Sequence, residues 1–275
     1  MGPVVAALLL SSCITTAAPE KRAVSAQSAA QSAGLTRQVV PGGGFDLTIF
    51  SRINAPGQAA RVYIEGDGLA WIGRYKVSAD PTPTEPVALR LAAADLQANP
   101  GQNVIYMARP CQYSSGPACQ KDYWTGKRFA PEVISAMDAA LSRVTDAGQV
   151  NGVELVGFSG GGAVAALLAA QRPDVVNLRT VAGNLDHRAH SRIHNVSLLA
   201  GSLNPPDRAA RLQSVPQYHF TGAQDKNVTS AVYEAYAAQL GDRKCVRHQV
   251  VPGVSHEEGW AAAWAALLAE PIACR

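Results

Sequence analysis

The hydrophobic positions of this chain follow two periods, and segments of one kind alternate with segments of the other. Short apolar runs or alternating patterns predict strands, whereas apolar residues recurring every three or four positions predict helices. We expect strands at 45–53, 61–64, 103–108, 153–156, 178–182, 217–221 and 246–251, and helices at 84–97, 131–144, 163–171 and 259–268. This order favours an α/β fold with a mostly parallel central sheet and helices on both faces. Ligands of such sheets bind beyond the carboxyl ends of the strands.

The most informative motif ends the strand predicted at 153–156. Gly157-Phe158-Ser159-Gly160-Gly161 has the G-x-S-x-G pattern, and an alanine-rich segment typical of a helix follows it. A strand, a sharp glycine turn and a helix form the context in which this pattern indicates a nucleophile elbow. The alternative is a glycine-rich turn that carries an incidental serine. We interpret Ser159 as a nucleophile.

A serine nucleophile needs a histidine base, and the histidine needs an acid that orients it. Asp225 lies in a turn directly after the strand predicted at 217–221. His256 ends the loop after the strand predicted at 246–251. The three residues occur in the order Ser, Asp, His, and each follows a predicted strand. This arrangement resembles that of the α/β-hydrolase superfamily of serine hydrolases. The resemblance implies a catalytic triad of Ser159, Asp225 and His256.

Other residues compete for the roles of acid and base. Asp186 and Asp207 are alternative acids, because some hydrolases place the acid after an earlier strand. His219 and His248 lie within predicted strands, where a packed or surface role is expected.

An oxyanion hole requires two N–H donors near the nucleophile. We expect Gly160 to supply one and the loop Glu65-Gly66-Asp67-Gly68 to supply the other, from Asp67 first or Gly68 second. Many relatives have His-Gly where this chain has Glu65-Gly66. Carboxylates would repel a developing oxyanion, so both acidic side chains should point away, paired with a base such as Arg74 or Arg109 or facing a substrate cation.

The composition and the amino-terminal sequence indicate the partners and the cellular compartment of the protein. The chain has 275 residues, of which 47% are hydrophobic and 16% charged, with a net charge of +3. No basic block interleaved with aromatic residues is present, which argues against nucleic-acid binding. The apolar run at 4–10 leads into Leu10-Ser11-Ser12-Cys13, which resembles the lipobox of bacterial lipoproteins. That resemblance implies a signal peptide at 1–12 and a membrane anchor at Cys13, placing the protein in the bacterial cell envelope, facing the periplasm.

Residues 13–36 are rich in Ala, Ser, Thr and Gln and predict a flexible tether. The catalytic domain would then occupy 37–275, with a small cap excursion at 186–212. Within that excursion, His187, His190 and His194 have spacings that place them on one helix face. A metal site there is disfavoured, because no adjacent acidic motif accompanies them. Scattered aromatic residues, among them Trp71, Tyr75, Tyr113, Tyr123 and Trp124, are candidates for the roof of the site.

Four cysteines remain beside Cys13. An even number in an oxidising compartment favours two disulfides, although four cysteines allow three connectivities. Cys111 and Cys119 bracket a compact loop, and Cys245 and Cys274 flank the last strand and helix. We expect these two pairs.

These observations predict a serine hydrolase of carboxylic esters that works through an acyl-enzyme and needs no cofactor or metal. A peptidase or amidase with the same triad is the first alternative. A tethered binding protein that kept the fold without turnover is the second.

Overall fold

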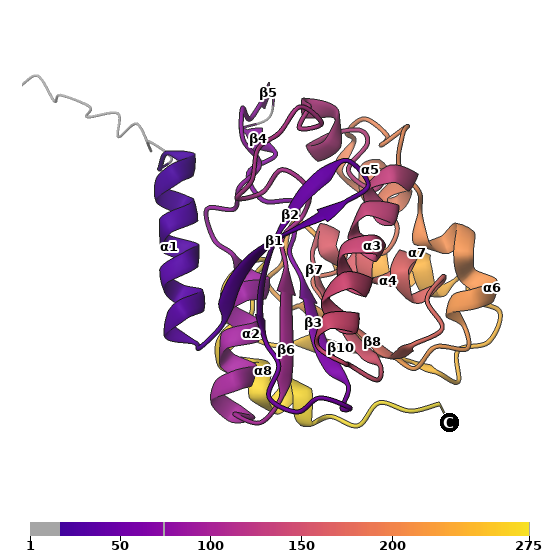
Figure 1. The fold of residues 1–275 in the computed structure, drawn as a ribbon. Helices are drawn as coiled ribbons and strands as arrows, with labels where there is room; N and C mark the ends of the chain where they lie inside the picture. The colour runs from indigo at the N-terminus through magenta and orange to yellow at the C-terminus, as the bar shows by residue number, and fades with distance from the viewer. Residues whose placement is uncertain (1–16, 74, 275) are drawn as a thin grey trace, which may run out of the picture.

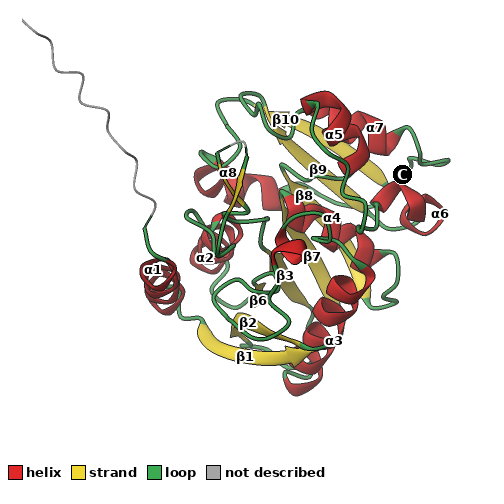
Figure 2. Ribbon diagram, turned by 90° about the horizontal axis from the view of Figure 1, so that it is seen from above, coloured by secondary structure: helices red, strands yellow, loops and turns green. Residues whose placement is uncertain are grey.

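The computed structural model describes residues 17–73 and 75–274, and its centre is a mostly parallel sheet (Figures 1 and 2). The eight strands lie in the order β1-β2-β6-β3-β7-β8-β9-β10. Their bounds are β1 Thr36–Gly42, β2 Phe45–Arg52, β3 Ala60–Ile64, β6 Asn103–Met107, β7 Val153–Phe158, β8 Val175–Val181, β9 Gln217–Gly222 and β10 Val246–Val251. Strands β6 to β10 and β3 pair in parallel, while β1 and β2 add an antiparallel edge. The predicted fold class is confirmed.

Helices cover both faces of this sheet. Their bounds are α1 Pro19–Ser32, α2 Val87–Ala98, α3 Pro131–Ala147, α4 Gly160–Ala169, α5 His187–His194, α6 Ala209–Leu212, α7 Ser230–Ala237 and α8 Trp260–Ala269. Apolar residues of α1, α2 and α8 form one core, and those of α3, α4 and α7 form the other. Successive residues of a strand point to opposite faces of the sheet and so contribute to different cores. In β3, Val62 and Ile64 belong to the core with α3, α4 and α7, and Tyr63 belongs to the core with α1, α2 and α8.

The amino-terminal segment corrects one prediction. Residues 19–32 form helix α1, not part of a flexible tether. Ala26 and Ala30 are buried against the domain, and the Arg22 guanidinium reaches the Thr82 carbonyl and the Asp80 carboxylate. Because alanine side chains are small, the helix can lie close to the domain. The composition of the segment therefore predicted less packing against the domain than the structure shows. The predicted signal peptide and Cys13 lie outside the described residues.

Smaller elements accompany the sheet and its helices. A hairpin of β4 (Trp71–Ile72) and β5 (Lys76–Val77) stands above α2 in Figure 1, and short 3-10 helices occur at Lys121–Trp124 and Pro205–Arg208. Both expected disulfides are present, Cys111–Cys119 and Cys245–Cys274. Within the described ranges, no helix has the length and apolar character needed to cross a bilayer.

Candidate active site

Ser159 occupies the sharp turn between β7 and α4. Its backbone has φ 49° and ψ −119°, a conformation that an L-residue adopts only under strain. A side chain at Gly157 would overlap the backbone of Gly161, and one at Gly161 would overlap the carbonyl oxygens that end β3. The turn therefore depends on these glycines, as the nucleophile-elbow interpretation requires. The serine lies at the carboxyl end of the sheet, and its side chain lines a cavity.

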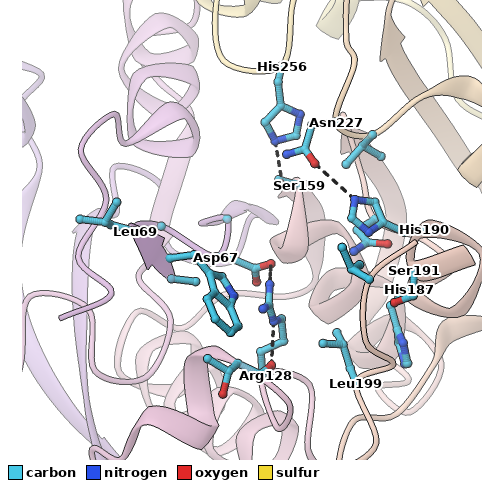
Figure 3. Close-up of a pocket in the computed structure, with 18 of the residues that line it drawn as sticks. Asp67, Leu69, Arg128, Ser159, His187, His190, Ser191, Leu199, Asn227 and His256 are labelled. Atoms are coloured by element: carbon cyan, nitrogen blue, oxygen red, sulfur yellow. Dashed lines mark hydrogen bonds and ion pairs between the residues drawn. The ribbon is translucent and has the colours of Figure 1, made fainter. Parts of the chain in front are cut away.

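The structure brings Ser159, His256 and Asp225 into one hydrogen-bonded row. His256 Nε2 lies 3.1 Å from Ser159 Oγ, and His256 Nδ1 lies 2.8 Å from Asp225 Oδ2. Figure 3 shows the imidazole directed at the serine. Because a carboxylate only accepts, Nδ1 donates to Asp225, and Nε2 is left to accept the serine proton. This arrangement can remove that proton and return it to a leaving group.

Asp225 is held by its own loop. Its other oxygen, Oδ1, accepts hydrogen bonds from the N–H groups of Asn227 (2.7 Å) and Val228 (2.9 Å). The carboxylate is fully buried, so these bonds and His256 orient it without competition from water.

The alternative acids have other partners. Asp186 caps the amino terminus of α5, accepting from the N–H groups of Arg188 and Ala189 at 3.0 Å. Asp207 forms an exposed ion pair with Arg188.

The alternative bases are also engaged elsewhere. His219 is buried between Thr180 and Gln217, and burial lowers its pKa to about 3. His248 bonds to Thr221 and stacks on Tyr233. Neither is bonded to Ser159.

The loop Glu65–Gly68 lies against the nucleophile. A methyl group at Gly66 would lie 3.3 Å from the Ser159 Cβ atom. The N–H groups of Glu65, Gly66 and Leu69 already have acceptors, at Met107, the Glu65 side chain and Pro81. Within the described part of the chain, Asp67 and Gly68 are the loop members with no such acceptor. Gly160 begins α4, whose first N–H groups have no intrahelical partner. The N–H groups of Gly160, Asp67 and Gly68 are thus free of these acceptors, and their role as oxyanion donors stays a prediction.

Glu65 points away from the serine into the protein. One carboxylate oxygen accepts from the N–H groups of Gly66 and Ala88, and the other accepts from the Tyr106 hydroxyl at 3.1 Å. Burial raises the pKa of Glu65 to about 7, although these donors oppose the rise. The Glu65 side chain thus joins the loop beside the nucleophile to the start of α2.

The Asp67 carboxylate, by contrast, lies against Gly160 at the start of α4, contrary to the prediction that it points away from this region, and it is paired with two arginines. Its oxygens lie 2.6 Å from Arg128 and 3.4 Å from Arg109. Burial favours a higher pKa for Asp67, but the two guanidinium groups outweigh it and lower the pKa. Arg109 was expected as a partner, and Arg74 lies outside the described residues. Arg128 was missed, because nothing in the sequence brings its loop to this site.

A cavity of about 940 Å³ opens above Ser159 (Figure 3). Of the aromatic residues expected to roof the site, Trp71 and Tyr75 line it, whereas Tyr113, Tyr123 and Trp124 do not. Residues of α5 and of 195–199 form another wall, so part of the predicted excursion at 186–212 borders the site.

The three α5 histidines do not act as a group. His190 and His194 bond to the side chain and the carbonyl of Asn227, while His187 is buried against Phe129. Among the described residues, no cluster of three His, Cys, Asp or Glu side chains could hold a metal ion.

Comparison with known proteins adds the family. Residues 84–252, more than half of the chain, match the model described as serine hydrolase (FSH1). The chain belongs to the FSH1 serine hydrolase family. The match includes Ser159 and Asp225 of this serine hydrolase, whereas His256 and the Glu65–Gly68 loop lie outside it. No curated protein sequence matches the chain.

Solved structures with the same fold include hydrolases of two kinds. The esterase Pf2001 of Pyrococcus furiosus has a TM-score of 0.59 at 13% identity, over 86% of this chain and 92% of the other. Est1E from Butyrivibrio proteoclasticus has a TM-score of 0.57 at 13% identity, over 84% and 95%. A puromycin-hydrolysing peptidase of Mycobacterium tuberculosis reaches 0.60 at 16% identity, over 85% of this chain and 37% of the other. At these sequence identities, the structural similarity shows a shared fold only.

Proposed function

We propose that this serine hydrolase cleaves carboxylic esters through Ser159, His256 and Asp225. The supporting observation is the unbroken row of hydrogen bonds from the Ser159 hydroxyl through His256 to the buried Asp225 carboxylate, at 3.1 and 2.8 Å. The cavity above the serine gives a substrate access to this row.

In the proposed reaction, His256 Nε2 takes the hydroxyl proton while Ser159 Oγ attacks the acyl carbon. The N–H groups of Gly160 and of Asp67 or Gly68 stabilise the negative oxygen of the tetrahedral intermediate. His256 then gives the proton to the departing alcohol, leaving an acyl-serine. Water, activated by the same imidazole, attacks this ester, releases the acid and restores Ser159.

Labelling with a fluorophosphonate probe tests the enzyme assignment. The wild-type chain should be labelled, and Ser159→Ala should not, because the probe reacts with an activated serine. On a chromogenic ester, Ser159→Ala should lower kcat by at least about 10³-fold. Equal labelling of both proteins, or none of either, would refute the proposal and favour the binding-protein alternative.

A substrate panel separates ester from amide hydrolysis. The same acyl groups should be offered as chromogenic esters and as aminopeptide anilides. Amine leaving groups are poorer than alcohols, so an esterase should turn over the esters far faster. Anilide turnover as fast as that of matched esters would favour the peptidase alternative.

We also propose export and lipid attachment at Cys13. The lipobox-like Leu10-Ser11-Ser12-Cys13 supports this, and the two disulfides fit an oxidising compartment. In bacterial cells fed a labelled fatty acid, the wild-type chain should carry label in the membrane fraction. Cys13→Ser should carry none; equal label in both would disprove attachment at Cys13.

A further inference from the structure

Exposed apolar side chains concentrate at one place on the described surface. Among the residues that the structure describes, ten large hydrophobic side chains are exposed, and six of them belong to two short segments. We call these six the mouth rim: Trp71, Ile72, Tyr75, Ile193, Val196 and Leu198. Their exposed fractions run from 41% for Trp71 to 83% for Tyr75. Scattered exposed apolar residues are ordinary, but a cluster of them indicates a contact surface.

Four of the six residues of the mouth rim line the cavity that leads to Ser159. Trp71 and Tyr75 line it from the β4–β5 hairpin, and Val196 and Leu198 line it from the segment after α5. The two segments are more than 100 residues apart in the chain, yet both lie at the end of the molecule that is uppermost in Figure 1. An apolar partner at this end would therefore cover the entrance to the active site.

The position of helix α1 determines which end of the domain a lipid at Cys13 would hold near a bilayer. The helix is fixed to the domain by buried Arg22, Ala26 and Ala30, and it begins at Pro19 on the same side as the β4–β5 hairpin (Figures 1 and 2). Cys13 precedes Pro19 by six residues. Six residues span at most about 22 Å, whereas a domain of this size is roughly 45 Å across. A lipid at Cys13 would thus hold this end of the domain, and not the opposite one, close to a bilayer.

We propose that the mouth rim is a membrane-docking surface, through which the active site receives an ester from the lipid phase. Trp71, Ile72 and Leu198 enter the interfacial layer of the bilayer, where an apolar side chain gains by leaving water and the Trp ring suits the mixed environment. The proposal rests on the ester-hydrolase function for its catalytic part, while the docking itself does not depend on turnover.

Tryptophan fluorescence tests the docking directly. The chain has four tryptophans, and Trp124, Trp260 and Trp264 are buried, so a bilayer can reach only Trp71 among them. In the full chain carrying Cys13→Ser, vesicles of brominated phosphatidylcholine should quench Trp71, and ordinary vesicles should shift its emission to the blue. Trp71→Phe should abolish both responses. An unchanged spectrum at saturating lipid would overturn the proposal, even if the leader itself binds vesicles.

A pair of matched variants tests the link to activity. Ile72→Ser/Ile193→Ser removes two rim side chains that do not line the cavity, and Val39→Ser/Val176→Ser removes two similarly exposed apolar side chains elsewhere. The rim pair should lower the rate on a vesicle-borne ester about tenfold or more, with a rate on a soluble short-chain ester within about twofold of the parent. The control pair should change neither rate by more than about twofold.

Two results would contradict the proposal, and a third would separate it from the proposed function. Equal loss on both esters would make the rim an ordinary cavity wall. A parent dimer that the rim pair converts to a monomer, seen by light scattering, would make a second copy the occupant. If no ester is cleaved but Trp71 is quenched, the proposed function fails while the docking stands.

Discussion

The Asp67 carboxylate lies against the α-carbon of Gly160, in the space that a side chain at position 160 would fill. Any such side chain would overlap Asp67 Oδ1. This oxygen is paired with Arg109, and the other carboxylate oxygen, Oδ2, is paired with Arg128. The two expected sources of oxyanion donors, the start of α4 and the Glu65–Gly68 loop, are therefore packed directly on each other. The two segments can keep this relative position only because residue 160 is a glycine and has no side chain.

Gly160→Ala should consequently lower kcat on a chromogenic ester by about 10- to 100-fold, because displacing Asp67 moves the donors away from the oxyanion. Gly126→Ala is the control: Gly126 lines the cavity, and a methyl group there meets no atom within 4 Å. Full activity of Gly160→Ala would show that the loop donor is not needed.

The choice of acid can be tested by removing single charges. Asp225→Asn should lower kcat by about 10³- to 10⁴-fold, because the amide cannot hold His256 in the tautomer that accepts the serine proton. Asp207→Asn breaks only an exposed ion pair with Arg188 and should leave kcat nearly unchanged. Asp186→Asn retains a good helix cap and should also be mild. The reverse ranking would move the acid to position 186 or 207.

Glu65 predicts a pH dependence of stability. Its folded-state pKa of about 7 lies above the ordinary 4.5, so the folded protein holds this proton where the unfolded chain releases it. The Glu65 contribution is therefore complete below about pH 4.5 and is lost as pH rises through about 7. Glu65→Gln resembles the protonated acid, so its unfolding free energy relative to wild type should increase over that range, by at most about 3 kcal/mol.

Urea unfolding of both proteins at several pH values measures this difference. The comparison cancels the opposite effect of buried His219, whose lowered pKa makes wild type and variant alike lose stability as pH falls. A difference that is constant with pH would mean that Glu65 ionises normally.

The sequence predicted the central sheet and the triad positions for a clear reason. Ser159, Asp225 and His256 each follow a strand, and parallel strands bring such positions to one edge of a sheet. Arg128 could not be found in this way, since it lies 61 residues from Asp67 in a loop that only tertiary packing places. Helix α1 was missed because its buried residues are mostly alanines, which give little hydrophobic pattern.

Helix α1 also supports the active site at a distance, which gives a final prediction. Arg22 binds the Thr82 carbonyl and Asp80, and the neighbouring Pro81 carbonyl accepts the N–H of Leu69 at 3.1 Å, next to the Glu65–Gly68 loop. Arg22→Gln leaves the Thr82 carbonyl buried without this donor, so the unfolding free energy should fall by about 1–3 kcal/mol. Lys21→Gln, on the exposed side of the same helix, should have little effect.

Urea unfolding measures the stability, and limited proteolysis measures how firmly α1 is held. In Arg22→Gln, α1 should be cut faster than in Lys21→Gln, and kcat should fall several-fold, since the segment 80–82 no longer supports the loop beside Ser159. Faster cleavage of α1 with unchanged kcat would separate the helix from the site, and equal cleavage of both variants would mean that Arg22 does not hold α1 in place.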